Sequence, residues 1–336
     1  MNTDVCIIGA GPVGIFSIFQ AGMLGMNCHV VDILSFPGGQ CSALYPEKPI
    51  YDIPAYPSIA GGDLIEKLME QASIFKPVFH LNSRAISIDG DKNSGFSVKI
   101  SSKSGEEKVI FAKSVIIAGG CGSFDANKPP LSGIEQYENN QVLYFIDKIS
   151  KFKDQRVVIA GGGDSAVDWA INLADIARSV YLVHRRANFR CMPESEKQLE
   201  RLSSLGKVKI MAPFQLKSLA GQGGMMTGVE IQNIDTNEDL LIEADFLLPF
   251  FGLKTELGVI ENWGLEISKR TIQVKHGSME TSRPGIYAIG DICGYEGKLK
   301  LILCGFSESA MAIHHLYSIV FPDRPLHFEH STSKKF

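Results

Sequence analysis

The chain has 336 residues, with 33 lysines and arginines, 37 aspartates and glutamates, and a formal net charge of -4. This length predicts about two domains, with enough apolar material for packed cores. The sequence has no sustained basic run and no interleaving of aromatic and basic residues, which disfavours a nucleic-acid partner.

The cysteines and the apolar runs indicate the cellular compartment. The seven cysteines are scattered and form no Cys-x-x-Cys pair, so neither a thiol redox pair nor a zinc site is expected. The first predicted strand begins at Asp4, which leaves no room for a signal sequence, and no apolar run is long enough to span a bilayer. We therefore expect a cytoplasmic protein with no metal and no membrane partner.

A nucleotide-binding pattern begins the chain. A predicted strand at 4–8 precedes a glycine-rich turn and a helix that ends near Gly25, and a second strand follows at 28–31. Glycines let such a turn approach a pyrophosphate, which then lies against free N–H groups at the helix N-terminus. An acidic residue after the second strand accepts a hydrogen bond from a free ribose 2'-hydroxyl, which favours FAD or NAD. The candidate residues are Gly9, Gly11, Pro12, Gly14 and Asp32.

The segment from 36 to 120 contains a loop, a helix and several strands. The loop at 36–46 includes Gly39, Gln40 and Tyr45 and is predicted to be irregular, either as a plain connection or as a ligand clamp. A helix is predicted at 62–75, with Asp63 as its N-cap. Alternating apolar residues predict a small antiparallel set at 85–88, 96–100 and 108–111, and a separate strand at 114–118 closes the nucleotide-binding sheet.

A second nucleotide-binding pattern lies in mid-chain, at 156–190. Strands predicted at 157–160 and 180–183 bracket a glycine turn and a helix, but the second strand is followed by basic residues and not by an acid. Arginines at this position favour a ribose 2'-phosphate, so this unit is predicted to bind NADP(H). The alternative is a glycine turn beside a solvated basic face. The candidate residues are Gly161, Gly163, Asp164, Ser165, His184, Arg185, Arg186 and Arg190.

The remainder of the chain supplies further elements and one more candidate. A helix is predicted at 193–205, a strand at 208–211, a hairpin at 228–233 and 240–243, and an apolar strand at 246–251. Near the end, a predicted strand finishes at Gly290 and Asp291, before an apolar helix at 306–320. Asp291 is expected either to accept hydrogen bonds from sugar-like hydroxyls or to cap that helix.

Together, these motifs resemble the flavoprotein reductases that have two dinucleotide-binding domains. Segments 39–48, 161–169, 290–297 and 330–332 are most similar to ferredoxin:NADP reductases of the thioredoxin-reductase-like type. The resemblance covers nearly the whole chain. It implies an α/β fold of two Rossmann-like, three-layer domains, with an NADP domain at 119–249 inserted into a FAD domain formed by 1–118 and 250–336.

The same resemblance implies roles for individual residues. Asp32 would hold the adenosine ribose of FAD, and Gln40 and Asp291 would contact the cofactor. Tyr45 and His330 would stack on the isoalloxazine ring. Thr332 would lie near the flavin together with His330. The weaker assignments place Phe124 near the flavin and Ala85 near the adenine, and the family implies a homodimer.

The implied activity is electron transfer from NADPH through FAD to ferredoxin or flavodoxin, by hydride transfer to flavin N5 and then single electrons. Segment 125–155 lacks the Cys-x-x-Cys pair of thioredoxin reductases, so no dithiol relay is expected. No side chain is expected to act as a general acid or base. Lys298 and Lys300 are candidates for docking an acidic ferredoxin, although exposed loop lysines more often only aid solubility.

Two alternative functions stay open at the level of sequence. An NAD(P)H oxidase or quinone reductase needs the same two nucleotide sites. A non-catalytic flavin and NADP redox sensor would also bind both cofactors.

Overall fold

The computed structural model describes residues 1–326. It divides into two compact units, the first formed by Met1–Ser123 together with the chain from Thr255 onward, and the second by Phe124–Lys254. The chain passes between the units through strands β9 (Ser123–Ala126) and β17 (Leu253–Glu256), which pair with each other. The predicted boundaries, at 118/119 and 249/250, fall shortly before these two crossings.

The first unit is built on a seven-stranded sheet. Its order is β5-β2-β1-β8-β7-β6, and β20 also pairs with β8. Strands β1, β2, β5 and β20 run parallel to their neighbours, whereas β6 and β7 are antiparallel. The strands are β1 (Asn2–Ile8), β2 (Cys28–Val31), β5 (Val78–His80), β6 (Ser83–Asp91), β7 (Gly95–Ser102), β8 (Glu107–Ile117) and β20 (Ile286–Ala288).

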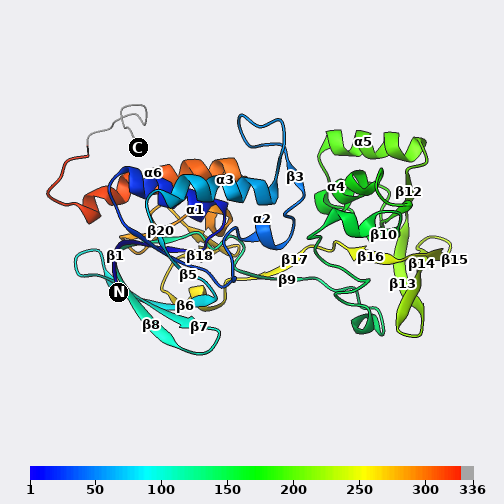
Figure 1. Ribbon diagram of the computed structural model, residues 1–336, viewed down its shortest axis with the longest axis horizontal. Coiled ribbons are helices and arrows are strands. Elements are labelled where there is room, and N and C mark those ends of the chain that lie inside the picture. Colours follow the sequence, from blue (N-terminus) through cyan, green and yellow to red (C-terminus); the bar gives the residue numbers. More distant parts are fainter. Residues whose placement is uncertain (327–336) are drawn as a thin grey trace. The chain divides into compact units, whose positions relative to one another are not determined.

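Three helices cover one face of this sheet: α1 (Pro12–Met23), α3 (Gly61–Ser73) and α6 (Ile302–Val320) (Figure 1). Successive side chains of a strand point to opposite faces, and β1 accordingly sends Val5 and Ile7 into the core beneath the helices and Cys6 and Ile8 into the core on the other face. Burial on both faces explains why the predicted first strand is a continuous apolar run.

Strand β8 corrects the prediction of two separate strands at 108–111 and 114–118. It runs without interruption, because the alternation of exposed and buried side chains continues through Phe111, Ala112, Lys113 and Ser114. Its first part is antiparallel to β7 and its last part is parallel to β1 and β20. The antiparallel strands are therefore an extension of the nucleotide-binding sheet and not a separate set.

The loop and the helix that follow β2 also differ from the predictions. The loop at 36–46 contains a short helix, α2 (Gln40–Ala43), although the sequence predicted irregular structure throughout. Helix α3 begins at Gly61 with Ala60 as its N-cap, so Asp63 lies within the first turn and does not cap the helix. The short strands of this unit are β3 (Pro49–Ile50), β4 (Ile59–Ala60), β18 (Ile267–Ser268), β19 (Thr271–Gln273) and β21 (Cys293–Gly294).

The second unit has a four-stranded parallel sheet, ordered β12-β11-β10-β16. An antiparallel sheet, β13-β14-β15, packs against it through a shared core that includes Val158, Val229 and Leu247. The elements are β10 (Arg156–Ala160), α4 (Asp164–Leu173), β11 (Ser179–Val183), α5 (Pro193–Ser204), β12 (Val208–Met211), β13 (Phe214–Gln222), β14 (Met225–Asn233), β15 (Asp239–Glu243) and β16 (Phe246–Pro249).

The predicted hairpin at 228–233 and 240–243 is confirmed as β14 and β15, but the prediction missed β13. An irregularity in the pairing of β13 with β14, between Leu216 and Ser218, interrupts the alternation that would have revealed the strand. Within residues 1–326, no helix is long and apolar enough to cross a membrane.

Two candidate dinucleotide-binding sites

In the first unit, steric contacts dictate the glycines of the turn between β1 and α1. Gly9 has φ +112°, and a Cβ at Gly9 or Gly14 would collide with the carbonyl oxygen of Ala118 or of Gly9 itself. Among residues 1–326, no atom would lie within 4 Å of a Cβ at Gly11, so this part of the chain leaves the space beside the turn open. Gly11 precedes α1 and provides no side-chain cap, which leaves backbone N–H groups at the positive end of the helix for an anion.

Asp32 connects the end of β2 to this turn. Its Oδ2 accepts a hydrogen bond from the N–H of Ala10 at 2.6 Å, and its Oδ1 accepts one from the N–H of Leu34 at 2.8 Å. Burial raises the pKa of Asp32, and these backbone hydrogen bonds oppose the increase. Each carboxylate oxygen can accept a second hydrogen bond, so Asp32 can still bind a ribose hydroxyl.

The loop after Asp32 lies directly against the glycine turn. The N–H of Gly38 donates to the carbonyl oxygen of Ala10 at 2.7 Å, and a Cβ at Gly39, where φ is +56°, would lie 3.0 Å from the Cα of Gly11. Gln40 is the first residue of α2, and its Nε2 would lie 3.8 Å from a Cβ at Gly120. Gly38 and Gly39 thus border the space beside the turn between β1 and α1.

Gly290 and Asp291 reach this place from the far end of the chain. Gly290 follows β20 with φ +75°, and a Cβ there would lie 3.6 Å from the side chain of Val13 in α1. Burial raises the pKa of Asp291, while the charges of Lys300 and Lys298 oppose the increase. Helix α6 begins at Ile302 with Leu301 as its N-cap, so the alternative that Asp291 caps this helix is wrong.

Tyr45 lies in the same neighbourhood. The ring is half-buried, and its hydroxyl is 3.6 Å from the thiol of Cys41, which donates to it. Burial raises the pKa of Tyr45 far above its usual range, and the charges of Cys41, Asp291 and Cys121 add to the increase. The charge of Asp291 therefore acts on the Tyr45 hydroxyl, although the two residues are distant in the sequence.

The structure gives fewer contacts for the other residues that were predicted near the flavin or the docking surface. Ala85 is buried in β6, near Ser83, whose N–H donates to the carbonyl oxygen of Asp32 at 2.9 Å. His330 and Thr332 lie outside the described residues, as does the side chain of Phe124. Lys298, predicted as a docking lysine, forms an ion pair with the fully buried Glu308 and is only 7% exposed, so it is not available on the surface.

In the second unit, the glycine turn between β10 and α4 is as tightly constrained as the first. A Cβ at Gly161, where φ is +155°, would lie 2.6 Å from the carbonyl oxygen of Phe250. A Cβ at Gly162 would collide with the imidazole ring of His184, and the carbonyl oxygen of Gly162 accepts the N–H of Arg190 at 2.7 Å. The predicted site residues did not include Gly162, because its contact with His184 exists only in the folded chain.

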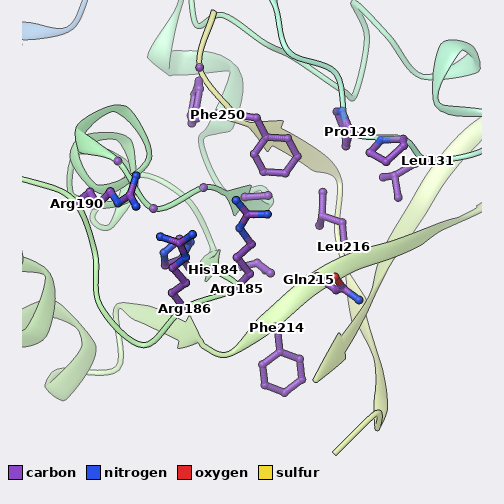
Figure 2. Close-up of a pocket in the computed structure, with 18 residues that line it drawn as sticks. Pro129, Leu131, His184, Arg185, Arg186, Arg190, Phe214, Gln215, Leu216 and Phe250 are labelled. Carbon is purple, nitrogen blue, oxygen red and sulfur yellow. The ribbon is translucent and has the colours of Figure 1, made fainter. Parts of the chain in front are cut away.

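The turn borders a cavity of about 700 Å³ within the second unit (Figure 2). The exposed side chains of Arg185, Arg186 and Arg190 line it, and the missed strand β13 forms one of its walls. Sequence reasoning did not find this wall or the apolar residues near the unit's ends, because distant segments contribute them. These additional lining residues are Pro129, Pro130, Leu131, Phe214, Gln215, Leu216, Phe250, Phe251 and Gly252.

His184 has a polar atom that lacks a partner. Its Nε2 is buried and makes no hydrogen bond to any described residue, and its ring stacks on Phe189 with centroids 5.3 Å apart. Burial lowers the pKa of His184, as do the charges of the neighbouring arginines, while a backbone hydrogen bond involving Asn188 opposes the decrease. Both causes disfavour the charged form of the imidazole, in keeping with its position among cations.

The remaining predicted residues of this unit lie at the start of α4. Gly163 is the N-cap of the helix. Asp164 accepts the N–H of Met192 at 3.0 Å, so this carboxylate fastens the loop that carries Arg190. Ser165 is exposed beside the turn. The predicted glycines, His184 and the three arginines thus line the cavity, Asp164 supports the loop beside it, and Ser165 is not part of the lining.

Comparison with known proteins defines the class. The family described as "Pyridine nucleotide-disulphide oxidoreductase" matches residues 3–312. The chain belongs to this family and is an oxidoreductase.

Curated relatives narrow the identification and confirm the resemblance seen in the sequence motifs. A protein of Wolbachia pipientis wMel named ferredoxin–NADP reductase is 53% identical over 99% of this chain and 97% of its own. Proteins of the same name from Rickettsia canadensis and Anaplasma marginale are 53% and 50% identical, over 99% and 98% of this chain and 97% and 99% of theirs.

Solved structures confirm the predicted fold class of two Rossmann-like α/β domains. Thioredoxin reductase of T. acidophilum matches with a TM-score of 0.80 at 23% identity, covering 94% of this chain and 98% of its own. The enzyme of Lactococcus lactis matches with a TM-score of 0.78 at 24% identity, covering 95% and 99%. At these identities the likeness concerns the fold alone.

Proposed function

We propose that the protein transfers electrons between NADPH and a ferredoxin or flavodoxin through FAD. The observation that carries this proposal is the opposite chemistry of the two sites: an aspartate follows the second strand of the first site, and a cluster of arginines follows that of the second. The first suits a free ribose 2'-hydroxyl and the second a 2'-phosphate. The printed names of the relatives support ferredoxin as the partner.

The first unit is the proposed FAD domain, and its residues fit this cofactor. The open space beside Gly11 accepts the pyrophosphate, Asp32 holds the adenosine ribose, and Gln40 and Asp291 approach from the two later segments. Tyr45 is the proposed stacking residue on the isoalloxazine ring, and the roles of Ala85, Phe124, His330 and Thr332 stay predictions. Bound FAD would supply hydride acceptance and single-electron release, which no side chain of the protein offers.

The second unit is the proposed NADP domain. Arg185, Arg186 and Arg190 reach the cavity as exposed cations, which suits them to a phosphate with several charged oxygens. The N-terminus of α4 at Gly163 offers backbone N–H groups to the pyrophosphate. The buried Nε2 of His184 is an additional polar atom at the rim of this site.

The cysteines support direct electron transfer from the cofactor to a protein partner. The segment that forms the second unit, 124–254, contains Cys191 and no second cysteine, so it cannot form the dithiol that a thiol relay requires. A one-electron carrier is therefore the proposed acceptor, in place of a disulfide substrate.

Anaerobic NADPH oxidation tests the proposal, with ferredoxin, flavodoxin, thioredoxin, a quinone and oxygen as parallel acceptors. Ferredoxin or flavodoxin is expected to be reduced fastest. Faster reduction of oxygen or a quinone would identify an oxidase or quinone reductase, and binding of both nucleotides without turnover of any acceptor would identify a redox sensor. A purified protein without a flavin spectrum would contradict the proposal altogether.

The proposed enzyme is a cytoplasmic homodimer, a state supported by the resemblance to the thioredoxin-reductase-like reductases. Light scattering of the purified holoprotein measures its mass directly. A mass equal to that of one chain, 36.7 kDa, would contradict the dimer.

A further inference from the structure

A buried ion pair lies behind the Gly290–Asp291 turn. Glu308 of α6 is 0% exposed, and its Oε1 contacts the ammonium of Lys298, which lies in the loop before α6. The side chain of Lys298 is almost completely shielded from water. Charged side chains are rarely so buried unless they are paired. The pair therefore needs an explanation that the proposed nucleotide contacts do not provide.

Glu308 holds the turn through neutral groups as well. Its Oε2 accepts the N–H of Gly290 at 2.7 Å, and its Oε1 accepts the hydroxyl of Tyr295 at 2.7 Å. The thiol of Cys293 donates to the carbonyl oxygen of Gly290 at 3.2 Å. One carboxylate thus fixes the backbone of the residue that precedes Asp291.

The pair also acts electrostatically on Asp291. Lys298 favours the ionised form of the Asp291 carboxyl and Glu308 disfavours it, while Lys300 adds a second favourable charge. Because the side chains of Lys298 and Glu308 are almost completely buried, solvent screens their charges less than it would screen charges at the surface. A change in either partner would therefore alter the charge beside Asp291 and beside any group that Asp291 contacts.

We propose that Glu308 and Lys298 are a positioning pair that fixes the Gly290–Asp291 turn and sets the local charge experienced by the redox cofactor held there. The inference rests on the proposed function, in which Asp291 contacts FAD. Neither residue touches the cofactor in this proposal. Both act through the turn and through the charge that they place behind it.

The test compares the reduction potential of the bound flavin in Glu308→Gln, Lys298→Met and the double variant. Loss of a negative charge favours the reduced, electron-rich cofactor, so Glu308→Gln is expected to raise the potential and Lys298→Met to lower it. The double variant is expected to return close to the wild-type value. In Glu308→Gln, the charge of Lys298 still acts on Asp291, and in Lys298→Met the carboxylate of Glu308 still accepts hydrogen bonds from Gly290 and Tyr295.

Opposite shifts distinguish this role from simple fastening. If the pair only held the turn in place, both single variants would bind FAD more weakly. Reduction potentials that shift in the same direction in the two variants, or do not shift, would overturn the proposal. If Glu308→Gln does not retain FAD, the pair Lys298→Arg and Lys298→Met decides the question. The arginine keeps the charge and is expected to keep the wild-type potential, so equal shifts in these two variants would be contrary to the inference.

Two controls complete the design. Lys113→Met removes a cation of the same unit that is paired with Asp4 at 2.8 Å and faces solvent, and it is expected to leave the potential unchanged. Tyr295→Phe removes a neutral donor to Glu308 and is expected to shift the potential less than Glu308→Gln does. A wild-type protein that binds no flavin would refute the proposed function itself, because no flavin couple could then be measured in any variant.

Discussion

Gly162 has no side chain, and this absence gives the imidazole of His184 its place beside the proposed NADP site. The imidazole of His184 occupies the space that a side chain at Gly162 would need, and the loop carrying Arg190 is hydrogen-bonded to the same glycine. The two halves of the predicted fingerprint, the glycine turn and the basic cluster, are thus in direct contact.

Gly162→Ala is therefore expected to displace His184 and to weaken NADPH binding. We expect the KM for NADPH to rise by at least about tenfold, equivalent to roughly 1.4 kcal/mol. Steady-state kinetics with a saturating electron acceptor measures the change. The FAD content should stay the same, because the contact lies entirely within the second unit. An unchanged KM would show that the turn accommodates the methyl group.

Arg185→Ala is expected to raise the KM for NADPH much more than the KM for NADH. A lost charge-assisted hydrogen bond to the 2'-phosphate costs about 1.5 to 3 kcal/mol, and NADH does not have this phosphate. The exposed Arg201 of α5 lies outside the cavity lining, so Arg201→Ala is the matched control for loss of a positive charge. Equal effects of Arg185→Ala on both nucleotides would rule out this role for Arg185.

Among the elements, β10 is held to its neighbours by a side-chain network as well as by its ladder. The guanidinium of Arg156 contacts the Asp245 carboxylate through Nε at 3.1 Å and through a second nitrogen at 2.6 Å, while the backbone N–H donates to the same carboxylate at 2.8 Å. These contacts hold the pKa of Asp245 below its usual range. The carboxylate therefore stabilises the second unit in its ionised form.

Asp245→Asn is expected to lower the free energy of unfolding of the second unit by about 1 to 2 kcal/mol at pH 7. The folded-state pKa is lowered, so the stabilisation is present above the ordinary pKa of 3.8 and is lost as the pH falls through the folded-state value. Urea unfolding of both proteins at pH 7 and at acidic pH should show the difference disappearing in acid. Asp175→Asn disrupts a surface pair with Lys207, and this control should change stability much less.

Sequence patterns predicted those elements whose signals are local. The strands and turns around Gly9 and Gly161 were predicted because an apolar run, glycines and a helix follow one another directly. The sequence did not predict the continuity of β8 or the presence of β13, since both depend on partner strands elsewhere in their sheets. The same reason explains why the cavity wall and the ion pair of Lys298 escaped prediction: each joins segments whose proximity arises only on folding.

At the scale of the whole molecule, the second unit is continuous in sequence and has its own core and its own cavity. The crossing strands β9 and β17 pair, so the chain leaves and re-enters the first unit at adjacent places. The two nucleotide functions are therefore expected to be separable.

A variant in which a short glycine-rich linker replaces residues 127–252 is expected to retain FAD and to lose NADPH-dependent reduction. The linker preserves the two crossing strands and with them the ends of the first unit. Visible absorbance measures the flavin, and chemical reduction by dithionite confirms that it is functional. Loss of FAD from a folded variant would show that the second unit is needed for the first cofactor.

The pairing of β20 with β8 has a consequence for how the protein is made. Val115–Ile117 of β8 pair with Ile286–Ala288, so this part of the central sheet has no neighbour on one side while the ribosome synthesises the second unit. The second unit emerges complete before the strand that finishes the first. During translation, the first unit must therefore stay incomplete, with one unpaired edge of β8 that can attract chaperones or neighbouring nascent chains.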